Sequence, residues 1–283
     1  MDLSIFDGIL FPEPADDYHE RSRNGEYVSS HMLALYRRDP ALYRARLNGD
    51  MPDTDATHFA FGRAAHAYIL EGAEAFMRGF IVGGPINLKT GKVYGRETAA
   101  FAAWLVEQAD GRQVVSQEEY DTIVDMSYAI FQHEHARRLI ERPGIVEHVA
   151  RARVCGVDCQ VRPDKVTIID GEPVIIDLKT TSDLDRFTYD AAAYGYLHQL
   201  AFYAHVLEVA ANLNRGSVGA RIVAVEKVAP YRVGVFILSM EGLDAAKEDN
   251  FTALQEIGRL PVAAMVGKYD LPLALNYPRK WSN

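Results

Sequence analysis

One short stretch constrains the fold of this chain more than any other, residues 162–181, which read RPDKVTIIDGEPVIIDLKTT. The segment Asp170-Gly171-Glu172-Pro173 supplies turn residues, and the runs before and after it have the length and apolar content of strands. The stretch therefore predicts an antiparallel hairpin whose second arm ends in Asp177-Leu178-Lys179. Because strand side chains alternate between faces, Asp177 and Lys179 project together while Leu178 points into the core.

A candidate metal site follows from this hairpin. Pairing of the two arms would bring Asp164 across the sheet toward Asp177. Mg²⁺ and Mn²⁺ take oxygen ligands, commonly one or two carboxylates together with phosphate oxygens of a substrate. A lysine ammonium beside them could orient a metal-bound water and offset charge on the attacked phosphate. Asp164, Asp177 and Lys179 are thus candidate catalytic residues of a metal-dependent nuclease, the alternative being a surface hairpin with a weak exposed ion pair.

Two helical segments carry further candidates. Residues 186–209 have a helical pattern in which Gln199 and Tyr203 lie four apart on one face, as QxxxY. Residues 56–72 predict an amphipathic helix with a G-x-x-x-H pattern that ends at His66. Taken alone, Tyr203 would be a core aromatic residue, and a helical histidine is more often structural or exposed than a ligand.

In letters and in order, these motifs resemble those of the PD-(D/E)xK nuclease superfamily, in its RecB-like and lambda-exonuclease-like branch. The G-x-x-x-H element is similar to that of the exodeoxyribonuclease VIII-like exonucleases of phages and prophages. The resemblance covers most of the chain. It implies an α/β fold with a restriction-endonuclease-like core, in which a mixed central β-sheet is flanked by helices and preceded by an N-terminal helical region.

The resemblance also implies roles for individual residues. It places His66, Asp164, Asp177 and the backbone carbonyl of Leu178 in a site for one or two Mg²⁺ or Mn²⁺ ions, with Glu147 as a further candidate ligand for a second metal or a water. An imidazole ligand suits Mn²⁺ better than Mg²⁺. Gln199 and Tyr203 would contact the DNA backbone.

The function implied by the resemblance is a double-strand DNA exonuclease that works in the 5′ to 3′ direction and leaves 3′ single-stranded overhangs for recombination. Such relatives form ring-shaped homo-oligomers, here a trimer or tetramer, and work with a single-strand annealing recombinase. A structure-specific or spacer-processing endonuclease of the same superfamily stays open as an alternative. So does a non-catalytic module that binds DNA or a recombinase, although the intact set of Asp164, Asp177 and Lys179 argues against a decayed site.

The charge balance restricts how DNA could bind. The chain has 39 acidic and 30 basic residues, a formal net charge of −9, so its overall field repels DNA and binding needs a localised basic surface. The candidates for that surface are Arg37, Arg38, Arg44, Arg46, Arg137, Arg138 and Arg142. The two cysteines cannot supply a four-cysteine iron–sulfur cluster or a disulfide framework. We find no signal-like or membrane-length apolar run, which predicts a cytoplasmic protein with no membrane partner.

The coarse organisation is one nuclease domain over residues 1–283. We expect a mainly helical part at 1–140, a catalytic sheet-and-helix core at 141–260 and a tail at 261–283. Within these parts, residues 1–25 predict an extended segment, residues 146–179 predict three strands, residues 219–239 predict two more, and a helix runs from 241 to 257.

Overall fold

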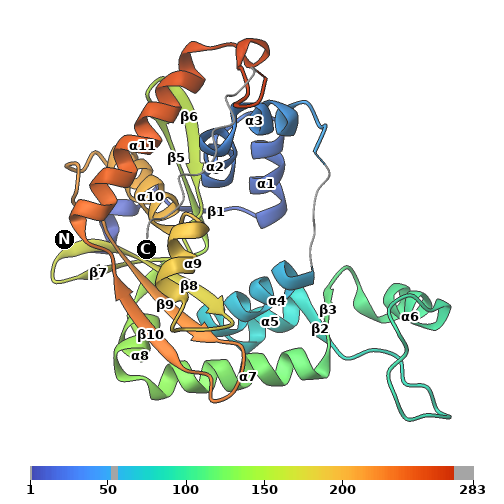
Figure 1. The fold of residues 1–283 in the computed structure, drawn as a ribbon. Helices are drawn as coiled ribbons and strands as arrows, with labels where there is room; N and C mark the ends of the chain where they lie inside the picture. Colours follow the sequence, from blue (N-terminus) through green and yellow to red (C-terminus); the bar gives the residue numbers. More distant parts are fainter. Residues whose placement is uncertain (1, 52–56, 271–283) are drawn as a thin grey trace, which may run out of the picture.

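A mixed five-stranded sheet lies at the centre of the computed structural model, which describes residues 2–51 and 57–270 (Figure 1). The strand order is β10-β9-β8-β7-β4, with β8 and β9 parallel and the other neighbours antiparallel. The strands are β1 Phe11–Pro12, β2 Phe80–Val82, β3 Gln113–Val115, β4 Gly144–Val146, β5 His148–Val154, β6 Val157–Val161, β7 Lys165–Ile169, β8 Glu172–Thr181, β9 Gly219–Glu226 and β10 Val233–Ile237.

The α-helices are α1 Ala15–Arg23, α2 Ser30–Arg38, α3 Pro40–Leu47, α4 Thr57–His66, α5 Ala73–Gly79, α6 Ala99–Trp104, α7 Gln117–Gln132, α8 Glu134–Glu141, α9 Phe187–Ala193, α10 Tyr196–Ala210 and α11 Met240–Arg259. Short 3-10 or π-helical turns are η1 Leu3–Phe6, η2 Ala67–Glu71, η3 Leu105–Ala109 and η4 Val262–Ala264. Several helices begin at side-chain caps that the sequence carries. At α7, for example, Ser116 and Glu119 form a reciprocal capping box.

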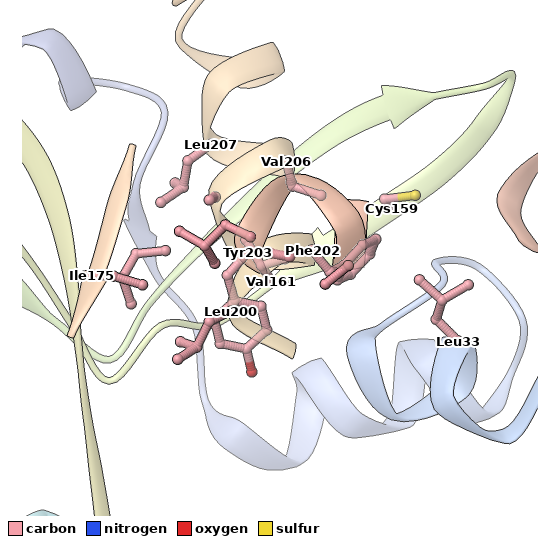
Figure 2. Packing of buried hydrophobic residues seen from close by; sticks show 14 of the residues in the cluster. Leu33, Cys159, Val161, Ile175, Leu200, Phe202, Tyr203, Val206 and Leu207 are labelled. Carbon is pink, nitrogen blue, oxygen red and sulfur yellow. The ribbon is translucent and has the colours of Figure 1, made fainter. Parts of the chain in front are cut away.

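Helices cover both faces of the central sheet. On one face α2, α3, α9, α10 and α11 pack around Ile175 in a core that also includes the β5–β6 hairpin. On the other face α4, α5, α7 and α8 pack around Ile176 and Leu178. Figure 2 shows part of the first core, where Leu200 and Tyr203 of α10 lie near Ile175 of β8. The helices on both faces keep water away from the middle of β8, where the candidate catalytic residues lie.

The predicted hairpin is confirmed, and every residue of β7 pairs with a residue of β8. Ile169 pairs with Glu172, and the two turn residues Asp170 and Gly171 both have positive φ, +53° and +84°, as a type I′ turn requires. Lys165 pairs with Ile176 at the far end of the ladder. The same register carried one residue further sets Asp164 against Asp177, as the sequence predicted.

The region before this hairpin differs from the prediction. Residues 144–181 form five strands rather than three, because β5 and β6 make a separate hairpin that joins β1 in a second sheet. The predicted extended segment at 1–25 was also wrong, because it contains α1, whose Tyr18 is buried. Tyr18 and Gln160 of β6 exchange hydrogen bonds, which ties α1 to the second sheet.

The predicted single helix over 186–209 is broken. It consists of α9 and α10, which meet at Gly195 with a φ of +71°. Glycine adopts this left-handed conformation at little cost, so it can end one helix and begin another within an otherwise helical pattern. The strands over 219–239 and the helix that follows are confirmed as β9, β10 and α11. The division into parts at 140 and 260 stays a prediction, and residues 271–283 of the tail lie outside the described residues.

A buried ion pair joins α10 to α11. Lys247 donates to both carboxylate oxygens of Glu208 at 3.0 and 3.2 Å, and both side chains are buried. The carboxylate also accepts hydrogen bonds from the backbone N–H groups of Gly216 and Val218. Burial would raise the pKa of Glu208, but its hydrogen bonds and the Lys247 ammonium outweigh burial and lower it. The charged pair is therefore a fixed part of this helix packing.

Replacing Lys247 with methionine should destabilise the fold strongly. The variant keeps the length of the side chain but removes the Lys247 ammonium from the buried Glu208 carboxylate, which typically costs about 3–5 kcal/mol. As a matched control, Arg215→Met removes an exposed pair with Glu248 and should cost less than about 1 kcal/mol. Urea unfolding measures both free energies of unfolding, and equal losses would contradict a structural role for the buried pair.

Candidate active site

Asp177 lies at the centre of the candidate site, on the same face of β8 as Ile175. Its side chain is fully buried, yet neither carboxylate oxygen accepts a well-formed hydrogen bond from a described residue. Nζ of Lys179 lies 2.7 Å from Oδ2 of Asp177. A buried carboxylate with unused acceptor positions is costly in a core and is expected where an external cation binds.

Asp164, the second aspartate of the site, lies directly before the neighbouring strand β7. Its Oδ2 accepts a hydrogen bond from the backbone N–H of Leu178 at 2.8 Å, so a side chain takes over where the β7–β8 ladder ends. The Leu178 side chain itself is buried in the core on the opposite face, as predicted. This bond fixes Asp164 beside the Asp177-Leu178-Lys179 segment without using its other carboxylate oxygen.

His66 and Glu147 reach the site from outside the hairpin. Nδ1 of His66, at the end of α4, lies 3.4 Å from Asp164 and 3.8 Å from Glu147. One ligand atom from each of these three residues lies within 4.8 Å of the other two, whereas Asp177 is not part of this close group. Glu147 lies between β4 and β5 with a φ of +55°, a conformation that costs a non-glycine residue energy and often marks functional sites.

Charges across the site shift each other's pKa values. Burial lowers the pKa of His66, but the carboxylates of Asp164 and Glu147 outweigh it and raise the pKa to about 9. Burial raises the pKa of Asp177 to about 6, despite the opposing charge of Lys179. Burial lowers the pKa of Lys179, but Asp177 and Asp164 more than offset it, so the ammonium stays charged. The protonated His66 and Lys179 balance the excess of carboxylates at neutral pH.

Gln199 and Tyr203 lie together on α10 as the spacing predicted. Nε2 of Gln199 donates to the Tyr203 hydroxyl at 3.2 Å. The ring of Tyr203 is buried in the first core (Figure 2), and burial, together with the charges of Asp164 and Asp177, raises the pKa of its hydroxyl. The tyrosine is therefore both a core residue and a neighbour of the site, and its predicted contact with DNA stays a prediction.

Two residues of the site were missed by the sequence reasoning. Arg162 contacts Glu147 at 2.5 Å, and its Nε is buried without a hydrogen-bond partner among the described residues. The ring of Tyr196 lies under the Lys179 ammonium, 4.9 Å from Nζ to the ring centroid. Signals for both were present, since Arg162 is two residues before Asp164 and Tyr196 is one helical turn before Gln199.

Most of the arginines proposed as a DNA-binding surface have partners within the protein. These partners are Asn250 for Arg37, the Met265 carbonyl and Asp270 for Arg44, Glu141 for Arg137, Glu134 for Arg138 and the Ile168 carbonyl for Arg142. The pairs of Arg137 with Glu141 and of Arg138 with Glu134 are exposed and therefore weak, whereas Arg37 bonds to the buried Asn250. A basic DNA-binding surface at these arginines therefore stays a prediction.

The residues present fit a hard divalent cation. Asp164, Asp177 and Glu147 supply oxygen atoms, His66 supplies one nitrogen, and the buried oxygens of Asp177 lack other partners among the described residues. Binding would displace the proton that His66 carries at neutral pH, since a ligating imidazole must be neutral. The Leu178 carbonyl stays a predicted ligand.

Comparison with known proteins agrees with this geometry. The sequence matches the family described as a PDDEXK-like domain of unknown function (DUF3799) over residues 29–259. The chain belongs to that family. This membership confirms the predicted PD-(D/E)xK superfamily and fold and supports a nuclease of that superfamily.

Solved structures add information on the fold. A protein from Eubacterium rectale, named as a candidate exonuclease, superposes with a TM-score of 0.58 over 88% of this chain and 86% of its own, at 14% identity. At that identity the likeness concerns the fold alone. A second structure, of SSO0001, has a TM-score of 0.27 and 12% identity over 69% of this chain and 85% of its own, and carries no argument. None of the curated proteins matches the chain. No helix within residues 2–51 and 57–270 is long and apolar enough to cross a membrane.

Divalent metal should stabilise the folded protein through Asp177. At about one hundred times its Kd, an ion that binds only the native state adds about 2.7 kcal/mol to the free energy of unfolding. Thermal unfolding with Mn²⁺ or Mg²⁺, compared with a chelator, should therefore show a higher Tm for the wild type and a much smaller shift for Asp177→Asn. Asp158→Asn, which removes an exposed carboxylate, serves as the control and should keep the full shift. An undiminished shift in Asp177→Asn would contradict the metal assignment.

Proposed function

We propose that the protein is a Mg²⁺- or Mn²⁺-dependent deoxyribonuclease that hydrolyses the phosphodiester bonds of DNA. One observation carries the proposal, the fully buried Asp177 carboxylate with unused oxygens, 2.7 Å from the Lys179 ammonium and opposite Asp164. A merely structural pair would be exposed or would have its hydrogen bonds satisfied within the core. Membership of a PDDEXK-like family supports the same conclusion.

The roles of the residues follow from their chemistry. A bound divalent cation would polarise a phosphate oxygen and lower the pKa of its water. Asp164, Asp177, His66 and Glu147 are the residues that would hold it, as one ion or as two. Lys179 keeps its proton, so its ammonium is suited to orienting the attacking water and to offsetting negative charge that builds on the phosphate. Gln199 and the Tyr203 hydroxyl would hold the DNA backbone from α10.

We further propose how the protein acts on DNA. We expect an exonuclease that enters at double-strand ends, proceeds 5′ to 3′ and leaves 3′ overhangs for a single-strand annealing recombinase. Support comes from the motif order and from the fold shared with a protein that is named as a candidate exonuclease. An endonuclease with the same site would differ in accepting DNA without ends.

Digestion of labelled DNA tests the proposal. Linear duplex labelled at the 5′ or the 3′ end and a covalently closed circle are incubated with Mg²⁺, Mn²⁺ or chelator. Wild-type protein should degrade the linear DNA alone and only with metal, and the order in which the two labels are released gives the direction. Asp177→Asn and Lys179→Ala should each reduce the rate at least about a hundredfold, since they remove a metal-binding charge and a charge-stabilising donor.

The control for these variants is Asp158→Asn, which changes charge equally at an exposed position and should keep the wild-type rate. Cleavage of the closed circle would show that the protein is an endonuclease and not an exonuclease. Full activity in Asp177→Asn, or metal-dependent DNA binding without cleavage by the wild type, would overturn the proposed catalytic function.

Assembly is a separate proposal. With a net charge of −9, a ring of three or four copies would allow basic residues to line an inner channel while the acidic exterior faces solvent. Sedimentation velocity gives the mass in solution. A monomer at high protein concentration, with and without duplex DNA, would contradict the ring.

A further inference from the structure

An exposed aromatic step adjoins the proposed catalytic site at the junction of α9 and α10. Tyr194 and Tyr196 flank Gly195, whose left-handed conformation turns the chain so that the two rings lie side by side. Their ring centroids are 5.9 Å apart, and the ring planes differ by 31°. Tyr194 is 72% exposed, so its ring faces solvent and is open to an incoming ligand.

The step is connected to the catalytic lysine. Tyr196 lies between the two, because its ring is 4.9 Å from Nζ of Lys179 on one side and contacts Tyr194 on the other. Tyr196 also packs against Phe187, which in turn contacts the ring of Phe236 of β10. The inner ring is therefore held by the core, and the outer ring of Tyr194 presents an exposed surface a short distance from the reacting groups.

None of these contacts explains why Tyr194 is a tyrosine. It caps the end of α9 with its backbone, which any residue could do, and its side chain contributes little to the core. Exposed aromatic rings beside charged groups that bind phosphate are the usual means of holding unpaired nucleotides, since every base offers a face for stacking. A paired duplex keeps its base faces stacked internally and offers no such partner except at its ends.

We infer that Tyr194, supported by Tyr196, is a base-stacking subsite that holds an unpaired nucleotide of the DNA strand next to the phosphate in the catalytic site. The inference rests on the proposed function and deepens it, because it assigns the site a strand that is single-stranded or frayed near the point of cleavage. Tyr196 has a second role in this account, as a positioning residue for the Lys179 ammonium.

The position of the Tyr194 and Tyr196 rings suits binding of DNA better than binding of a protein partner. The exposed ring is continuous with Lys179, so an occupant of Tyr194 would also reach the proposed phosphate site. Tyr189, an exposed tyrosine on α9, has the Arg186 guanidinium 5.8 Å from its ring, which adds positive charge rather than an apolar rim. A protein-docking patch would instead be expected to continue as a contiguous apolar surface.

Binding of short oligonucleotides that carry 2-aminopurine tests the inference, since the fluorescence of this base is quenched when it stacks. All measurements are made in Asp177→Asn protein with Mg²⁺, so that no DNA is cleaved. Tyr194→Leu should weaken binding of a single strand roughly five- to hundredfold, the range for one lost base stack, and should abolish the quenching. Tyr194→Phe keeps the ring and should retain both signals.

Two comparisons make the result specific. Tyr128→Leu removes a ring that is 67% exposed and belongs to α7, a helix on the other face of the sheet. This variant should leave both the affinity and the quenching unchanged. A blunt duplex of the same sequence should lose much less affinity than the single strand in Tyr194→Leu. Unchanged binding and quenching in Tyr194→Leu, or an equal loss for duplex and single strand, would overturn the inference.

Two further outcomes distinguish a failure of the stacking subsite from a failure of the proposed nuclease function. If Tyr194→Leu changed the sedimentation coefficient of the free protein instead of its DNA binding, the ring would be a contact between copies, and the stacking subsite would be overturned. Cleavage assays with intact Asp177 read the proposed function independently. Loss of quenching together with an inactive wild-type protein would support the subsite and overturn the nuclease, whereas normal quenching in Tyr194→Leu with an active wild type would do the reverse.

Discussion

The register between β7 and β8 is the constraint on which the site depends. It is set by the tight turn at Asp170-Gly171, and it places Asp164 against Asp177 while the alternation of β8 puts Leu178 into the opposite core. A shift of one residue would reverse the faces and bury Lys179 among the apolar residues of the second core. Because both faces of the sheet are covered by helices, a slip would place the charges of Asp177 and Lys179 in an apolar core, and this cost opposes any other register.

The sequence predicted those parts of the molecule that depend on local pattern. The hairpin, the pairing of Gln199 with Tyr203 and the helical segment predicted over 56–72, which is α4 followed by η2, all follow from periodicity and turn chemistry over short stretches. The predictions that were wrong concern elements that depend on long-range packing or on the backbone conformation of a single residue. Gly195 breaks a helix that its neighbours favour, and α1 forms because Tyr18 finds partners on β6, far away in sequence.

The site itself was predicted unevenly for the same reason. Motif residues on one hairpin could be placed from spacing alone, but the contacts of Arg162 with Glu147 and of Tyr196 with Lys179 join side chains whose proximity no local pattern shows. Even with these contacts, the buried oxygens of Asp177 lack hydrogen-bond partners among the described residues. The carboxylates of Asp164, Asp177 and Glu147 are buried or partly buried close to the cations of His66, Lys179 and Arg162, and the unused oxygens of Asp177 prepare the site for a further cation.

We propose that a divalent cation binds among Asp164, Asp177 and His66. A crystal structure of the protein with Mn²⁺, using the anomalous scattering of manganese, would locate the ion. We expect an anomalous peak within about 2.0–2.4 Å of carboxylate oxygens of both aspartates, in the distance range of hard divalent cations. Manganese bound only elsewhere, or a fully loaded crystal in which Asp177 coordinates nothing, would contradict it.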